Sequence, residues 1–191
     1  MPSIFFTADL HLGHAGILTH QPSRHEAFDN TYHMDDVIID TINSLVSKND
    51  ELWILGDFAW KASKYGHYRH RLNVRKIHVI RGNHDSSSLR AHVSSMNDMV
   101  YKKFAGVKFH MTHYPMASWR AREHGSVHLY GHSHGSIEND LNTMYPGRRS
   151  MDIGVDCAYA RFGVWRPFLL NEIFQLLGVD NDSIRACSVS G

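Results

Sequence analysis

Cysteine is nearly absent from this sequence, with only Cys157 and Cys187 among 191 residues. Two thiols cannot form the disulfide framework of a small secreted domain, and their spacing matches no zinc-binding motif. The sequence also lacks an apolar run near the roughly 18 residues that a membrane span needs. No basic residue precedes the apolar stretch at residues 4–6, as a signal peptide would require. We therefore expect a reducing, cytoplasmic compartment and no membrane association.

Neither positive nor negative charge is in excess. Twenty Lys and Arg residues balance nineteen Asp and Glu residues, which gives a formal net charge of +1. A dedicated nucleic-acid binder is usually strongly basic, so we expect no stable nucleic-acid complex. At roughly 150 residues per domain, the length predicts one domain, over residues 1–178, followed by a polar tail over residues 179–191.

The hydrophobic pattern predicts alternating strands and helices in the first half of the chain. We expect strands at residues 4–8, 52–55 and 77–80, a long loop at 13–32, and helices at 34–46 and within 62–73. In the second half we expect a hairpin of strands 99–104 and 107–112, strands at 127–130 and near 151–156, and a helix at 168–177. This order predicts an α/β sandwich whose first strands are parallel and whose later strands are antiparallel.

Histidine, by contrast, is abundant, with 16 residues. Nearly every predicted strand is followed by side chains of the kind that bind metals. The segments are Asp9-Leu10-His11, Gly56-Asp57, Gly82-Asn83-His84-Asp85, His113 and Gly131-His132-Ser133-His134. In open α/β sheets ligands bind beyond the carboxyl ends of the strands. We therefore expect these loops to converge on one site.

Single matches carry little weight in a chain so rich in histidine. Asp-x-His and His-x-His are each expected about once by composition alone. Gly-Asn-His-Asp, in contrast, is expected about 0.005 times. Its presence among the other segments, each at a predicted strand end, argues against coincidence.

In this order the segments resemble those of the calcineurin-like metallophosphoesterase superfamily. The resemblance covers residues 4 to about 175. The segments Asp9–His14, Leu55–Phe58, His113–Pro115 and Gly154–Asp156 are similar to a small single-domain bacterial and phage branch. It implies a four-layer α/β sandwich with a mixed sheet core. It also implies two divalent metals, one held by Asp9, His11, Asp57 and His134, the other by Asp57, Asn83, His113 and His132. His84 would reach the leaving-group oxygen instead of a metal.

The donor chemistry agrees with this implied assignment. Imidazoles, carboxylates and one amide oxygen, without thiolate, favour Mn²⁺ first, with Fe, Zn²⁺ or Ni²⁺ as alternatives. Two adjacent dications need an anion between them, and Asp57 is the acid in its loop. Two such ions can activate a bridging water and clamp phosphate oxygens.

Other residues near these loops are weaker candidates. Asp85 is adjacent to His84 and is expected to orient or charge-stabilise its ring. His14, Arg120 and Arg122 are candidates for substrate contact, and Trp60 for stacking on a base. Arg24 lies in a predicted loop and is expected to be solvated.

We therefore expect a metal-dependent phosphoric ester hydrolase, in which a metal-bridging hydroxide attacks phosphorus and His84 assists the leaving group. The expected substrate is a small, nucleotide-like phosphodiester, because no second specificity domain is present. Phosphomonoesterase and nuclease activities on the same site are the alternatives. A non-catalytic scaffold on the same fold is a more remote one, since all the ligand positions are filled.

Overall fold

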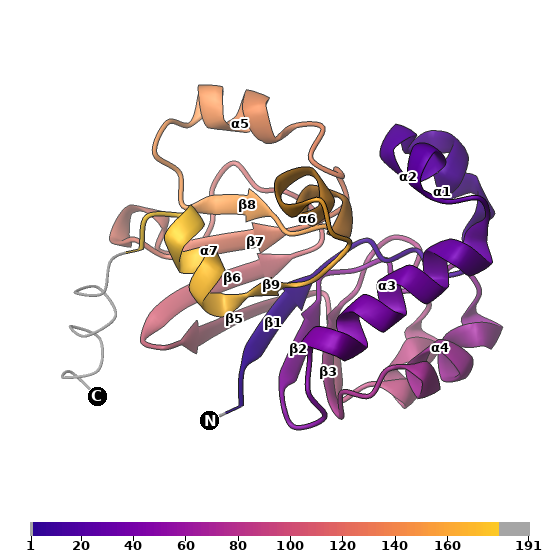
Figure 1. Ribbon diagram of the computed structural model, residues 1–191. Helices are drawn as coiled ribbons and strands as arrows, with labels where there is room; N and C mark the ends of the chain where they lie inside the picture. The colour runs from indigo at the N-terminus through magenta and orange to yellow at the C-terminus, as the bar shows by residue number, and fades with distance from the viewer. Residues whose placement is uncertain (1, 180–191) are drawn as a thin grey trace.

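The computed structural model describes residues 2–179 and contains two β-sheets packed face to face (Figure 1). The first sheet has the order β4 (Ser95–Asn97), β3 (Lys76–Ile80), β2 (Glu51–Ile54), β1 (Ile4–Thr7) and β9 (Phe168–Leu169). The second has the order β5 (Met99–Phe104), β6 (Val107–Thr112), β7 (Val127–Tyr130) and β8 (Ser150–Asp152). Both sheets are mixed, as the predicted fold class requires.

Strand direction differs in part from the expectation. β1 to β4 are parallel, and β5 pairs antiparallel with β6 in the predicted hairpin. The later strands β6, β7 and β8 are parallel to one another, however, so the prediction of antiparallel pairing there is wrong. Long connections lie between these strands, and such connections return the chain for parallel pairing.

Seven α-helices lie within the described residues. They are α1 (Ala15–His20), α2 (Pro22–Ala27), α3 (Thr31–Leu45), α4 (Tyr65–Arg71), α5 (Glu138–Met144), α6 (Val155–Phe162) and α7 (Leu170–Leu176). Three 3₁₀ helices, η1 (Ala62–Lys64), η2 (Ser87–His92) and η3 (Arg122–His124), complete them. The predicted helices at 34–46, 62–73 and 168–177 are confirmed as α3, α4 and α7.

The predicted loop at 13–32 is wrong in its first part, because it contains α1 and α2. Each has six residues, which is less than two turns and too short to show a hydrophobic period. The long helix α3 begins where the Asn30 side chain accepts a hydrogen bond from the His33 amide at 3.0 Å. The strand expected near 151–156 ends at Asp152, and α6 follows it.

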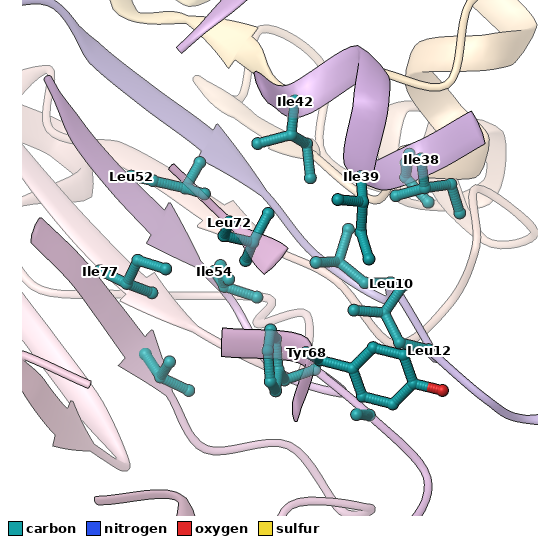
Figure 2. Close-up of a cluster of buried hydrophobic side chains, with 14 of the residues drawn as sticks. Leu10, Leu12, Ile38, Ile39, Ile42, Leu52, Ile54, Tyr68, Leu72 and Ile77 are labelled. Carbon is teal, nitrogen blue, oxygen red and sulfur yellow. The ribbon is translucent and has the colours of Figure 1, made fainter. Parts of the chain in front are cut away.

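The two faces of the first sheet contact different cores because side chains alternate along each strand. Phe5, Leu52 and Ile77 belong to an outer cluster that packs against α3 and α4, whereas Phe6 and Trp53 belong to an inner cluster between the sheets. Figure 2 shows Ile38, Ile39 and Ile42 of α3 above Leu52 and Ile54 of β2. Each such fully buried side chain contributes about 1.5–3 kcal/mol. The short strands are thus held from both sides.

The remaining layer, over the outer face of the second sheet, is mostly irregular. The Trp119 ring stacks on His128 of β7 with ring centroids 5.1 Å apart, and Arg148 donates to the Tyr130 hydroxyl at 2.8 Å. Val179, expected to begin the tail, is buried with the inner cluster, and residues 180–191 of that tail lie outside the described residues. In the described part of the chain, no helix has the length and apolar character to cross a membrane.

Candidate metal centre

Loops from both sheets meet at one edge of the sandwich. The parallel strands β1, β2 and β3 end just before Asp9, Asp57 and Asn83, while β6 and β7 end just before His113 and His132. Three backbone contacts hold these loops together. Ala8 and Gly154 form a parallel bridge, the Asp9 amide donates to the Gly56 carbonyl at 3.0 Å, and the Gly131 amide donates to the His113 carbonyl at 2.9 Å. The two sheets therefore share one site.

The predicted ligands form two adjoining groups. One donor atom from each of Asp9, His11 and His134 lies within 4.8 Å of the others, and the same holds for Asp57, His113 and His132. The Asn83 Oδ1 atom joins the second group, 3.0 Å from His113 Nε2 and 3.1 Å from His132 Nδ1. All seven predicted ligand residues are thus together.

Asp57 lies between the two groups. Its Oδ2 atom is 3.5 Å from His11 Nε2 and 3.5 Å from His113 Nε2. Its Oδ1 atom accepts a hydrogen bond from the His84 amide at 3.0 Å. This is the position that a bridging carboxylate needs.

The backbone at these ligands is strained. Seven described non-glycine residues have positive φ, and five of them are predicted ligands: Asp9, His11, Asp57, His132 and His134. For L-residues such angles each cost of the order of 1–3 kcal/mol and concentrate at functional sites. Here they turn successive side chains back toward one point.

Two buried groups fit a cation at this point. The His11 Nε2 atom is buried and has no hydrogen-bond partner. Burial lowers the pKa of His11 to about 2, so its ring is the neutral form that binds metals. Burial also raises the pKa of Asp9 to about 7, because the carboxylate is removed from water. A divalent ion beside both would use the free nitrogen and offset the buried negative charge.

The second group also attracts positive charge. Burial opposes protonation of His113, but Asp57 and Asp9 outweigh it and raise its pKa to about 9. Burial likewise opposes ionisation of Asp57, but His113 and His11 lower its pKa to about 2. A metal ion bound here would replace the proton on His113. The donor set therefore fits divalent metal ions.

A buried ion pair supports the first group, and the sequence did not reveal it. Arg24, expected to be solvated, is fully buried and donates through Nη2 to Asp156 Oδ2 and to the Asp9 carbonyl, both at 2.6 Å. Asp156 Oδ2 in turn lies 2.7 Å from His134 Nδ1. Such a carboxylate behind an imidazole fixes the tautomer and orientation of a metal-binding ring. The sequence analysis used the segment Gly154–Asp156 only as part of the family resemblance. It did not indicate that Asp156 pairs with Arg24 and contacts His134.

The structure corrects the prediction that Asp85 orients the His84 ring. Its carboxylate accepts hydrogen bonds from the amides of Asp57, Phe58 and Gly82, at 2.8, 3.0 and 2.9 Å, and does not orient the His84 ring. These bonds fasten the turn after β3 to the turn after β2. Asp85 is thus a positioning residue, because both of its oxygens are occupied by backbone donors.

His84, His14 and Trp60 form the rim of the centre. His84 Nε2 lies 4.0 Å from Asp57 Oδ2, and the side chain is about one-third exposed. His14 Nδ1 lies 3.3 Å from His11 Nδ1, and its ring stacks on Trp60 with centroids 3.8 Å apart and planes 4° apart. His84 and Trp60 ring centroids are 5.1 Å apart. The structure thus places both predicted contact residues, His14 and Trp60, beside His84.

The two arginines expected to contact substrate are engaged elsewhere. The Arg120 guanidinium lies over the Tyr101 ring, 4.5 Å from its centroid. Arg122 donates to the Ala117 carbonyl at 3.0 Å and packs over Trp119. Cation–π packing holds both on the outer side of the second sheet, and substrate contact by either arginine stays a prediction.

Comparison with known proteins finds relatives but no matching family model. The chain is 26% identical to the Gene 66 protein of Mycobacterium phage L5, over 82% of this chain and 87% of that protein. It is also similar to the solved structure of AQ665, a protein of unknown function from Aquifex aeolicus. That match has a TM-score of 0.74 and 20% identity over 92% of this chain and 100% of the other.

Two further solved structures match a smaller part of the chain. The Pseudomonas putida nuclease MPE has a TM-score of 0.45 and 22% identity, over 69% of this chain and 61% of its own. An archaeal phosphodiesterase has a TM-score of 0.43 and 22% identity, over 68% of this chain and 72% of its own. The two mixed sheets, the order of the ligand-bearing loops and their meeting at one edge agree with the fold that the sequence resemblance to the calcineurin-like metallophosphoesterase superfamily implies.

Proposed function

We propose that this protein is a two-metal phosphoesterase that hydrolyses a phosphodiester in a nucleotide-like substrate. The observation that carries the proposal is the position of Asp57 Oδ2, 3.5 Å from a histidine of each ligand group. One carboxylate shared by two groups of neutral and anionic donors is suited to a pair of divalent ions. Mn²⁺ is the first choice for such a donor set, with Fe, Zn²⁺ or Ni²⁺ as alternatives.

Bound at this centre, two divalent ions supply Lewis acidity toward phosphoryl oxygens and lower the pKa of water. The ligands of the first group would be Asp9, His11, Asp57 and His134, and those of the second Asp57, Asn83, His113 and His132. Asp156 holds the ring of His134 through Nδ1, and the Leu55 carbonyl lies 2.8 Å from His113 Nδ1. Those contacts leave the Nε2 atom of each ring to face the centre.

His84 supplies the remaining chemistry. Its amide donates a hydrogen bond to Asp57, which holds its ring at the rim of the centre. The neighbouring residue Asn83 lies among the candidate ligands. From there Nε2 can donate a proton to the departing alkoxide as the P–O bond breaks. Water is consumed, and the products are a phosphomonoester and an alcohol.

The aromatic rim favours a nucleotide-like substrate. The stacked pair His14 and Trp60 lies beside His84, and Trp60 is 43% exposed. An exposed indole is a stacking surface for a nucleobase attached to the phosphate. This arrangement supports a substrate with a nucleoside on the leaving group.

The test compares metal content and hydrolysis. Protein saturated with Mn²⁺ and then dialysed should hold two ions per chain by elemental analysis. It should hydrolyse bis(4-nitrophenyl) phosphate and a dinucleotide faster than 4-nitrophenyl phosphate. At most one ion at saturation would contradict the two-metal centre. Two ions with no hydrolysis of any ester would instead favour a scaffold.

A further inference from the structure

The near-zero net charge conceals an uneven distribution. Residues 58–84 contain seven Lys and Arg residues and no Asp or Glu, so the rest of the chain carries a net charge of −6. This basic segment begins directly after the central ligand Asp57. A local excess of one sign creates a local field even where the total charge is small.

Part of this segment lines a cavity beside the centre. The cavity has a volume of about 190 Å³ and is lined by, among others, Gly13, Tyr32, Lys61, Lys64, His67 and Arg71. Gly13 is two residues from His11, and two residues span at most about 7 Å. The Trp60 amide donates to the Leu12 carbonyl at 3.0 Å, which holds the two walls together. The cavity is therefore adjacent to the metal ligands.

Two lysines are the cations of this cavity that are available to a ligand. Arg71 is paired with Asp36 at 2.6 Å. The Asp35 carboxylate also lines the cavity, but it accepts from the Gly13 amide at 2.9 Å and the Tyr68 hydroxyl at 2.8 Å. Lys61 and Lys64 are exposed and form no ion pair within residues 2–179. An anion in the cavity would meet both ammonium groups.

Trp60 connects the cavity to the centre. It directly precedes Lys61, and its ring stacks on His14, whose Nδ1 lies 3.3 Å from that of His11. The order along this surface is thus metal ligands, an exposed aromatic ring, then two lysines. Alternation of aromatic rings with basic side chains is the pattern of single-stranded nucleic-acid binding surfaces, in which bases stack and phosphates pair with cations.

We propose that the substrate is a single-stranded nucleic acid. Lys61 and Lys64 bind the phosphate next to the cleaved one, and Trp60 stacks on the base between them. The inference rests on the proposed function for the cleavage step and narrows its substrate class to a polynucleotide. It replaces the expectation, drawn from net charge alone, that no nucleic-acid complex forms.

The test uses a double variant with a matched control. Lys61→Gln/Lys64→Gln removes the two cavity lysines. Lys103→Gln/Lys108→Gln removes two exposed lysines that face each other across the β5–β6 hairpin, at the other end of β6 from His113. With the Mn²⁺-loaded enzyme, the cavity variant should raise KM for a single-stranded oligonucleotide about 10-fold. It should also lower the slope of log KM against the logarithm of the salt concentration by about 1. The control should change neither and should hydrolyse bis(4-nitrophenyl) phosphate at the wild-type rate.

A binding measurement separates this inference from the proposed function. Fluorescence anisotropy with a labelled oligonucleotide in EDTA reports binding without cleavage, and Trp60→Ala should weaken it about 10-fold with no change in salt slope. Unchanged binding in the cavity variant, with the small diester still hydrolysed, would overturn the inference alone. Weakened binding in a protein that hydrolyses no ester would support the surface and overturn the proposed function. Tighter binding of a duplex than of a single strand would overturn the assignment to single strands.

Discussion

Arg24 and Asp156 form a buried ion pair between residues 132 positions apart, with Nε 2.8 Å from Oδ1 and Nη2 2.6 Å from Oδ2. The same guanidinium donates to the Asp9 carbonyl, and the same carboxylate contacts His134. Two metal-ligand loops from different sheets are therefore fixed by one pair of side chains. Its removal should affect both stability and metal affinity.

Asp156→Asn should lower the free energy of unfolding by about 3–5 kcal/mol, because it leaves the Arg24 charge buried without its partner. Urea denaturation in metal-free buffer measures the change. Asp98→Asn is the control, since the Arg81–Asp98 pair has the same 2.6 Å separation but is solvent-exposed. That variant should lose less than about 1 kcal/mol. Equal losses in the two variants would show that burial of the Arg24 pair adds nothing.

The same pair should make the protein sensitive to acid. Burial alone would raise the pKa of Asp156, but Arg24 and His134 lower it well below its ordinary value. A carboxyl with a depressed pKa in the folded state stabilises the protein above its unfolded pKa, near 4. This contribution is lost as the pH falls below about 4 toward the folded pKa. Urea midpoints between pH 2 and 6 should therefore fall more steeply in wild type than in Asp156→Asn, and parallel curves would contradict this.

Asp57→Asn should impair both metals, whereas His11→Ala should mainly weaken one, because Asp57 lies between both groups and His11 belongs to the first. Calorimetric titration with Mn²⁺ and elemental analysis measure the two losses. His124→Ala, an exposed histidine on η3, should keep both ions. If Asp57→Asn and His11→Ala each lost a single ion, Asp57 would not bridge.

His84→Ala should keep both metals and lose activity most strongly for poor leaving groups. A general acid matters most when the departing alkoxide is basic, so the loss should be about 100-fold for a nucleoside ester and smaller for a nitrophenyl ester. A leaving-group series with metal analysis of each preparation tests this. Metal loss would identify His84 as a ligand, which its 4.0 Å distance from Asp57 permits. A uniform loss across the series would mean that His84 binds phosphate.

Gly56→Ala should disrupt the second ligand group. Gly56 has φ +97°, and an added Cβ would lie 2.2 Å from His113 Nδ1, which must then move. Gly163→Ala also replaces a glycine of positive φ, +68°, but its Cβ would meet nothing within 4 Å. Both variants should lose stability through the positive φ. Gly56→Ala alone should lose metal affinity, and equal affinity in the two variants would contradict the placement of His113.

Sequence reasoning grouped the candidate ligands because they follow short apolar strands, and the ends of parallel strands share an edge. Asp57 and Asn83 were predictable for this reason, as was the amphipathic helix α3. Arg24 was not, because nothing in its own segment indicates burial and its partner is distant in the chain. Asp85 was misassigned because the geometry of its turn, and not its position beside His84, directs its carboxylate to the backbone. The two six-residue helices α1 and α2 were too short to produce a detectable period.

The shared edge of the two sheets has a consequence for how the molecule unfolds. Asp9, Asp57 and Asn83 extend from the first sheet, whereas His113, His132 and His134 extend from the second. Metal ions that bind only the folded state would take ligands from both sheets at once. Their binding free energy would then add to the stability of the folded protein. The sheets then cannot separate without releasing the ions. Metal saturation should therefore couple the two halves into one cooperative unfolding unit, with a single transition whose midpoint rises with metal concentration.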